Sequence, residues 1–247
     1  MTALAERKAT VLSKIEEQGK LTAELKKAIE AAEKLADVEE LYLPYKEKRR
    51  TKATIAREAG LFPLARLILQ NKASLEEEAQ AFVCDGFETV DKAIAGACEI
   101  LIESFSEDNR LRSWVYNEIW SYSSIISSVK DETADDKKTF QIYYDFSEKV
   151  SKMQGYRILA LNRGEKLGIL KVGFDHNTDK MIRFMASRFK NRNAYIDDVI
   201  SKTIKKKIVP AMERRIHSEL TESAEDGAIE LFSEKSSQLA FSITVKR

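Results

Sequence analysis

A cluster of aromatic and basic side chains lies in the N-terminal part of the chain. Tyr42 and Tyr45 flank Pro44, and five cations follow within seven positions. Grouped cations bind phosphate backbones because neutralising the phosphates releases condensed counterions. Tyrosine rings can in addition stack on unpaired bases. The residue types therefore indicate a nucleic-acid contact, and the candidate phosphate ligands are Lys46, Lys48, Arg49, Arg50 and Lys52.

A structural interpretation of the same segment stays open. The two tyrosines would then pack a loop against neighbouring helices, and the arginines would pair with acids at 74–91. That stretch has six acidic residues and no basic one. We expect Arg49 and Arg50 to form such pairs, and we expect the three lysines to face phosphate.

A second basic region covers residues 180–207 and contains nine Lys and Arg side chains. Asp197 and Asp198 lie within it. Basic residues that alternate with apolar residues along a helix are typical of a solvated face, and we favour that interpretation here. The cations are Lys180, Arg183, Arg188, Lys190, Arg192, Lys202, Lys205, Lys206 and Lys207.

Other patterns that could catalyse a reaction or bind a metal fail on inspection. Gly164 and Gly168 lack the trailing Lys-Ser/Thr of a phosphate-binding loop. Two histidines and two cysteines, scattered along the chain, do not form a convincing zinc site. The stretch 175–179 resembles the start of a calcium loop, but Lys180 replaces the required glycine. The sequence predicts no catalytic residue, no metal site, no cofactor and no enzyme activity.

The composition favours a helical, soluble protein. The chain has 247 residues with only nine Gly and three Pro, and residues that favour helices are abundant. Lys and Arg (41) nearly balance Asp and Glu (40), so the net charge gives no argument for nucleic acid. The charge-free run 119–129 is too short for a membrane span, which needs about 20 apolar residues. We expect a cytoplasmic protein without a membrane partner.

Apolar spacing and helix-end signals predict several helices in the first part of the chain. Residues 1–36 read as an antiparallel helix pair, in which Gly19 ends the first helix and Thr22 caps the second. The helix that follows the basic segment begins at about Thr51 and ends at Gly60. Pro63 can then occupy the first turn of the next helix.

Similar signals predict helices through the rest of the chain. Thr89 and Ser106 each begin one, and 157–164 reads as a short helix with a glycine end. Two long amphipathic helices fill the C-terminal third. Pro210 divides them because proline disrupts the interior of a helix.

Strand signals are few. Residues 168–174 alternate in the manner of a strand, and 240–245 is a second candidate. The aromatic segment 140–146 fits a helix or a strand. The sequence thus predicts an all-α fold, a multi-helix array with helical hairpins and a small β element. We expect one region, 1–247, with two subregions at 1–85 and 86–247.

Two motifs resemble one protein family. The stretch 41–65 reads LYLPYKxKRRTxATxARExGLxPLA, and 157–165 reads RxLALNRGE before the strand GILKV. Residues 85–101 match more loosely. These motifs are similar to those of the Tex-type transcription accessory proteins of bacteria, which are related to a eukaryotic elongation factor. The resemblance runs from about residue 4 to 235.

The resemblance implies a part of a longer protein. Family members join a helical scaffold and a helix-turn-helix-like module to an RNase H-like domain, a helix-hairpin-helix pair and an OB-fold RNA-binding domain. This chain would be the N-terminal helical region alone, without the RNase H-like and OB-fold domains. It departs from the family at 154–157, where Pro-Ser-His-Arg is common, and at 241–247.

The function that the resemblance implies is a non-catalytic helical scaffold associated with transcription. Its partners would be RNA or DNA, bound weakly by this region, and the transcription machinery. We expect a monomer. The alternative is a protein-interaction module with no nucleic-acid contact of its own.

Overall fold

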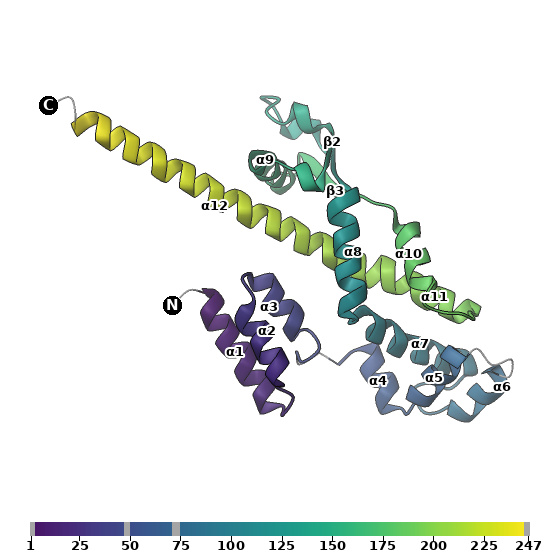
Figure 1. Cartoon of the computed structure of the whole chain (residues 1–247). Coiled ribbons are helices and arrows are strands. Elements are labelled where there is room, and N and C mark those ends of the chain that lie inside the picture. Colours follow the sequence, from purple (N-terminus) through teal and green to yellow (C-terminus); the bar gives the residue numbers. More distant parts are fainter. Residues whose placement is uncertain (1–2, 47–49, 71–74, 245–247) are drawn as a thin grey trace. The chain divides into compact units, whose positions relative to one another are not determined.

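The computed structural model describes residues 3–46, 50–70 and 75–244, with side chains up to Gly227 (Figure 1). The chain forms two compact units. The first unit contains 1–113 and 179–208, and the second contains 114–178 and 209–247.

Three helices begin the first unit and share a small core. Thr22 caps the second helix, where its Oγ1 accepts a hydrogen bond from the backbone N–H of Leu25 at 3.2 Å. Gly19 adopts φ +64° after the first helix, a conformation that glycine reaches without steric cost. The predicted helix pair is therefore confirmed, and a third helix packs against both. The helices are α1 (Ala3–Glu17), α2 (Ala23–Ala31) and α3 (Leu35–Tyr42).

The rest of the first unit is built around α7, which is buried along most of its length. Helices α4, α5 and α11 pack directly against it. Thr51, Pro63 and Thr89 occupy the helix starts where the sequence predicts them. The elements are α4 (Lys52–Glu58), α5 (Phe62–Gln70), α6 (Leu75–Ala79), a 3-10 turn (Gln80–Phe82), α7 (Val90–Ser106), α10 (Thr178–Ala186) and α11 (Ala194–Lys202).

The expected division between residues 85 and 86 stays a prediction. Helix α4 precedes that point and α7 follows it, and the two pack closely together in the first unit.

A π-helical segment, Thr203–Ile208, follows α11 and leads into α12 (Val209–Thr244). The sequence predicts a break at Pro210, and the irregular turn lies immediately before it. Proline has no N–H, so the carbonyl four residues earlier loses its usual partner. A π-turn is one way for a helix to adapt to such a loss.

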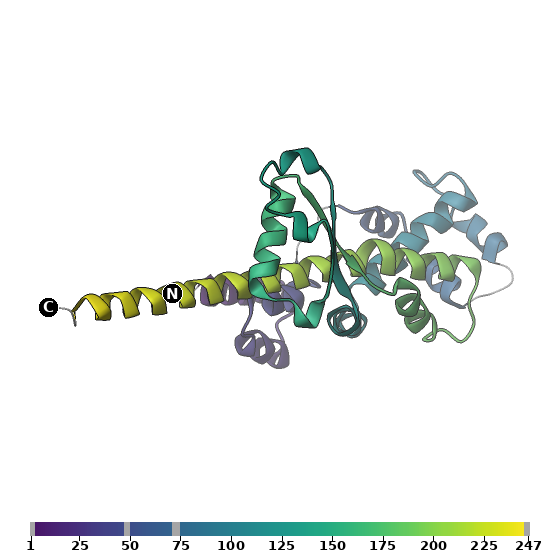
Figure 2. The ribbon, with the colours of Figure 1, turned by 90° about the horizontal axis from the view of Figure 1, so that it is seen from above.

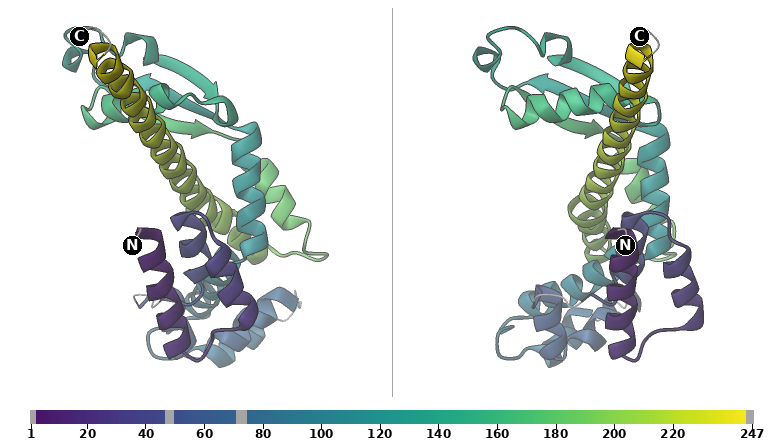
Figure 3. Two further views of the ribbon diagram at one scale, coloured as in Figure 1. Left: turned by 60° about the vertical axis from the view of Figure 1, so that its left-hand side comes forward. Right: turned by 90° about the vertical axis from the view of Figure 1, so that its left-hand side faces the viewer.

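The second unit contains a three-stranded antiparallel sheet in the order β2-β1-β3. Helix α9 packs against both β3 and α12 (Figures 2 and 3). Helix α8 (Asn109–Tyr122) precedes the sheet in the chain. The other elements are β1 (Ser124–Val129), β2 (Asp145–Lys149), α9 (Gly155–Lys166) and β3 (Leu170–Asp175).

The structure confirms the strand predicted at 168–174, which is β3, and corrects other boundaries. The strand predicted at 240–245 is wrong, because 240–244 continues α12. Ser106 ends α7 instead of beginning a helix. The next helix is capped by Asp108, whose Oδ1 accepts from the N–H groups of Arg110 and Leu111. A short carboxylate is an equally good cap, so sequence signals alone could not choose between Ser106 and Asp108.

The segment 140–146 contains both structures that the sequence left open. A 3-10 turn, Gln141–Tyr143, precedes β2.

Strand β1 was not predicted, because its serines obscure the apolar alternation. Its central position in the sheet comes from pairing with both neighbours.

Across the described ranges, none of the helices has the length and apolar character needed to cross a membrane.

Candidate nucleic-acid interface

The two tyrosines of the basic segment serve the fold of the first three helices. Tyr42 ends α3 and is only 3% exposed, in a core with Val11, Ile15 and Ile29. The guanidinium of Arg7 lies 5.7 Å from the centre of its ring. Such burial leaves no face of Tyr42 for a base, so its structural interpretation is the better one.

Tyr45 shapes the turn that leads into the cations. Its N–H donates to the carbonyl of Tyr42 at 2.9 Å. Its own carbonyl accepts from Gln18 Nε2 at 2.8 Å. Tyr45 is partly buried against the same core. The turn is thereby held to α1, and Lys46 projects from its end into solvent.

The five candidate cations do not share one environment. Lys48 and Arg49 lie outside the described residues. Lys46 and Lys52 are exposed, and neither has an acidic partner among the residues that the structure describes. Both therefore remain available to an external anion.

Arg50 pairs with Glu58 at 2.7 Å, and both side chains are more than half exposed (69% and 53%). The sequence predicted a pair with an acid at 74–91, and the structure shows this other partner instead. Exposed pairs of this kind contribute under about 1 kcal/mol. Arg50 can thus exchange its partner for a phosphate at small cost.

Helix α4 places Lys52 on a rigid support. Thr51 Oγ1 accepts from the N–H of Thr54 at 3.0 Å and donates to Glu103 of α7 at 3.0 Å. Arg57 forms an ion pair with the same carboxylate. Buried alanines on α4 permit close packing against α7. Lys52, the first residue of α4, is therefore fixed in position at its backbone.

A hollow of about 350 Å³ lies beside Lys52. Ile55 and Phe87 contribute apolar surface, and Lys92 and Glu99 also line it. Lys92 already pairs with Glu88 at 2.5 Å. Of the cations described around this hollow, Lys52 is thus the one without a carboxylate partner.

The second basic region, 180–207, is distributed over α10, α11 and the π-helical segment. Arg188 forms an ion pair with Asp108, Arg192 with Asp197, and Lys202 with Asp198. The three consecutive lysines of the π-helical segment are exposed, and no partner is present among the described side chains. They are Lys205, Lys206 and Lys207.

The two histidines do not form part of a metal site. His176 Nε2 lies 2.9 Å from a carboxylate oxygen of Glu213, and its Nδ1 lies 3.0 Å from Thr178 Oγ1. The hydrogen bond to Glu213 raises the pKa of His176, against the opposing effect of burial. In the described part of the chain, no three His, Cys, Asp or Glu side chains gather closely enough to hold a metal ion.

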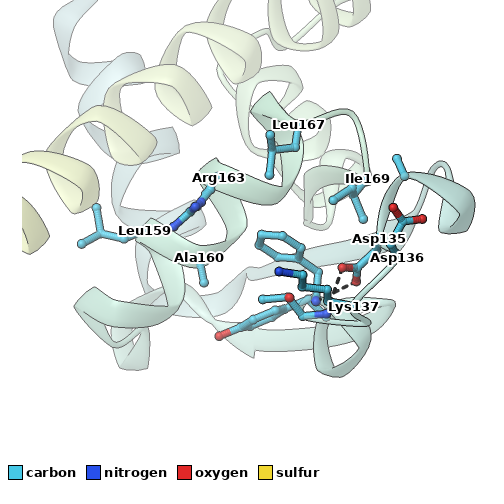
Figure 4. A pocket seen from close by; sticks show the side chains of 12 residues that line it. Asp135, Asp136, Lys137, Leu159, Ala160, Arg163, Leu167 and Ile169 are labelled. Atoms are coloured by element: carbon cyan, nitrogen blue, oxygen red, sulfur yellow. Dashed lines mark hydrogen bonds between the residues drawn. The ribbon is translucent and has the colours of Figure 1, made fainter.

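Sequence reasoning missed one residue with the properties of a binding group. Arg163 lies in the motif at 157–165, and the structure places it in α9 beside a cavity of about 580 Å³ in the second unit (Figure 4). A signal was available in the sequence. Leu159, Arg163 and Leu167 recur every four residues, which places a cation between two apolar side chains on one helix face.

Comparison with known proteins places this architecture in context. A family model described as Tex central region-like matches residues 70–232. The chain is 39% identical over 241 residues to the uncharacterized protein YdcI of Bacillus subtilis, covering 94% of this chain and 34% of that protein. It is 36% identical to the transcriptional accessory protein Tex of Neisseria gonorrhoeae, covering 93% of this chain and 32% of that one.

A more distant relative is the human S1 RNA-binding domain-containing protein 1, which is 26% identical over 261 residues. The match covers 97% of this chain and 26% of the human protein. The chain spans about a third of the length of the bacterial relatives that it matches.

Proposed function

Because this chain belongs to the Tex family, we propose that it is a non-catalytic helical scaffold of a transcription accessory protein, and that its basic segment contacts nucleic acid. The proposed nucleic-acid contact rests on the exposure of Lys46 and Lys52 and on their lack of an acidic partner among the described residues. They lie at the two ends of the segment. Arg50 adds a third charge that is held only by an exposed pair.

The family relationship supports the choice of nucleic acid as the partner. Relatives carry the printed names transcriptional accessory protein and S1 RNA-binding domain-containing protein. A few lysines on a surface bind phosphates through counterion release, without reading bases. We therefore expect weak binding, little dependence on base sequence and a steep loss with salt.

The proposed scaffold role rests on how helices hold the two ends of the basic segment. One end continues from a turn anchored on α1 and α3, and the other begins α4, which is tied to α7 through Glu103. The backbone of Lys46 and that of Lys52 are each positioned by a neighbouring helix, which reduces the entropy that these two residues lose on binding.

The test compares two double-lysine variants with the unmutated chain. Lys46→Ala/Lys52→Ala should weaken binding of a labelled single-stranded RNA. It should also make the plot of log affinity against log salt shallower by roughly 1.4, since each lost contact contributes about 0.7. Fluorescence anisotropy across a salt series provides both quantities.

The matched control is Lys26→Ala/Lys27→Ala, which removes the same charge from exposed positions on α2. It should leave the salt slope unchanged. An equal effect of both double variants would show that only net charge matters. If the unmutated chain does not bind RNA or duplex DNA at low salt, the nucleic-acid proposal is wrong and the protein-interaction alternative replaces it.

A specific observation also favours that alternative. Two large exposed side chains of the α9 surface line hollows: Leu167 (55% exposed) lines one, and Tyr156 (64%) lines another. Exposed aromatic and aliphatic groups around a hollow are typical of protein contacts. This surface belongs to the second unit, whereas the basic segment belongs to the first.

A further inference from the structure

Among the residues that the structure describes, the polar residues of the motif at 157–165 have internal partners, except Arg163. Arg157 donates to Glu148 at 2.6 Å, and Asn162 donates to Thr221 at 2.9 Å. Glu165 accepts from the backbone N–H of Val172 in β3 at 3.2 Å. Arg163 has no such partner among the residues that the structure describes, and its side chain is exposed. Its guanidinium is therefore available to an external group.

Arg163 adjoins the cavity of about 580 Å³ together with apolar residues of α9 (Figure 4). Leu159, Ala160 and Leu167 come from the same helix, and the facing loop contributes Asp135, Asp136 and Lys137. A cavity of this size can hold several side chains of a peptide or one small ligand.

One of the charged side chains in the facing loop, Asp135, forms hydrogen bonds within the loop. Asp135 is buried, and its carboxylate accepts from the N–H groups of Thr139 and Phe140 at 2.9 and 2.8 Å and from Tyr144 Oη at 3.1 Å. It has no remaining need for a ligand. Asp136 and Lys137 are both exposed and adjacent, so their charges offset each other. Arg163, across the cavity on α9, is the cation without a compensating carboxylate.

The exposed face of α9 is continuous. Tyr156, Leu159, Arg163 and Leu167 follow one another at intervals of three or four residues, so they form one stripe along the helix. Leu159 also lines a second, apolar hollow of about 410 Å³ between α9 and α12. The stripe therefore has a cation at its centre, and it adjoins both the cavity of mixed polarity and the apolar hollow.

We propose that this face of α9 binds a short protein segment that carries a carboxylate flanked by apolar side chains. The carboxylate would pair with the guanidinium of Arg163, whose planar fork can donate hydrogen bonds to both carboxylate oxygens at once. The apolar side chains would fill the hollows beside Leu159 and Leu167. Covering an arginine with apolar groups would be unfavourable without a counter-charge, and this requirement selects an acidic segment. Tyrosine and arginine are also enriched among residues that dominate binding energy.

The same surface suits a nucleic acid less well. Phe140 and Tyr143 line the cavity, but both are buried and offer little ring surface for base stacking. A phosphate backbone would leave the apolar hollows empty. A peptide satisfies both the cation and the hollows.

The experiment selects binders from a phage-displayed library of random linear peptides on the purified chain. Selected peptides should carry Asp or Glu next to Leu, Phe or another large apolar residue. A fluorescent version of one such peptide is then titrated with the unmutated chain and with Arg163→Glu. The variant should bind about tenfold or more weakly, as expected for loss of a charge-assisted hydrogen bond. Arg163→Lys should give an intermediate loss because it keeps the charge and removes the fork.

The control variant is Arg183→Glu, which reverses an exposed cation on α10 in the first unit and should bind the peptide as the unmutated chain does. A peptide with Asn or Gln in place of its acid should lose the same affinity as Arg163→Glu causes, and this measurement does not depend on the folding of a variant. Selection of peptides without a carboxylate, or indifference to Arg163→Glu, would overturn the proposal.

Two further results would assign the surface to another occupant and would equally overturn the proposal. One is binding of single-stranded RNA that Arg163→Glu abolishes. The other is a dimer of the unmutated chain, seen by sedimentation, that Arg163→Glu dissociates. The contact proposed at Lys46 and Lys52 is tested separately by Lys46→Ala/Lys52→Ala, so failure of the peptide proposal is distinguishable from failure of the proposed nucleic-acid contact.

Discussion

Arg112 and Arg50 each pair with a carboxylate, but in different surroundings. Arg112 donates through Nη2 to Glu40 at 3.0 Å and through Nη1 to the carbonyl of Ser106 at 3.1 Å. Its side chain is 10% exposed and that of Glu40 is 19% exposed. Arg50 reaches Glu58 on an open surface. Solvent screens the second pair and leaves the first largely unscreened.

We predict that Arg112→Ala lowers the free energy of unfolding by about 3 kcal/mol, because it breaks an ion pair whose two side chains are largely buried. Arg50→Ala should cost less than about 1 kcal/mol. Urea unfolding followed by circular dichroism measures both. Similar losses for the two variants would contradict the assignment of Arg50 to an exposed pair.

His176 should make the stability of the second unit depend on pH. The hydrogen bond to Glu213 raises its pKa above the ordinary value of 6.5. A group whose pKa rises on folding stabilises the fold fully below its unfolded pKa, and it loses that contribution as the pH rises through the folded value. The charged imidazole is therefore the stabilising form.

We expect the unmutated chain to lose stability relative to His176→Gln as the pH is raised from below 6.5 through the elevated pKa of His176. The measurement is the free energy of unfolding in urea at a series of pH values. Parallel curves for the two proteins would show that the His176 and Glu213 pair does not contribute. Glu213→Gln should remove the same pH dependence.

At the level of elements, Gly164 lets α9 approach β3. A Cβ at this position would lie 2.6 Å from Leu170 Cδ1 and 3.0 Å from Phe140 Cδ1. Leu170 and Phe140 are both buried, so neither can move freely. The position therefore requires glycine for space, and the helix tolerates its lower helix propensity.

Gly164→Ala should destabilise the second unit, since overpacking costs about 1–3 kcal/mol while the gain in helix propensity is at most about 1 kcal/mol. Gly227→Ala in α12 is the matched control, because nothing lies within 4 Å of its added Cβ. It should be neutral or stabilising by up to about 1 kcal/mol. Thermal melts of the two variants compare them directly, and a stabilised Gly164→Ala would disprove tight packing of α9 on β3.

At the level of the whole chain, the Tex-family relationship concerns about a third of each bacterial relative's length. Within that part, the described side chains form no metal cluster, and His176 is held by Glu213 and Thr178. A general base must be able to reach a proton of its substrate, and an imidazole engaged at both nitrogens is poorly placed for that role.

We predict that the purified chain does not hydrolyse single-stranded RNA, duplex DNA or nucleoside triphosphates, with or without added Mg²⁺ or Mn²⁺. Gel assays of the nucleic acids and phosphate release from the nucleotides measure this. Turnover that a single carboxylate substitution abolishes would contradict the non-catalytic proposal. Turnover that no substitution in the chain affects would indicate a contaminating enzyme.

The sequence alone determined the features that depend on local chemistry. Helix starts at Thr22, Thr51 and Thr89 follow from side chains that accept backbone N–H groups, and β3 follows from its own alternation. The motifs were long enough to indicate the family. Each of these signals is contained within a short stretch of chain, so no knowledge of distant contacts was needed.

The tertiary structure decided what depends on neighbours from elsewhere in the chain. Tyr42 is a core residue because it packs against apolar residues of α1 and α2, and Arg50, which precedes α4, pairs with Glu58 at the end of that helix. Strand β1 is the central strand because it pairs with β2 and β3, which both follow it in the sequence. Arg163 stands out only after its neighbours' partners are known. Burial and partner choice are properties of packing between segments, and local periodicity does not contain them.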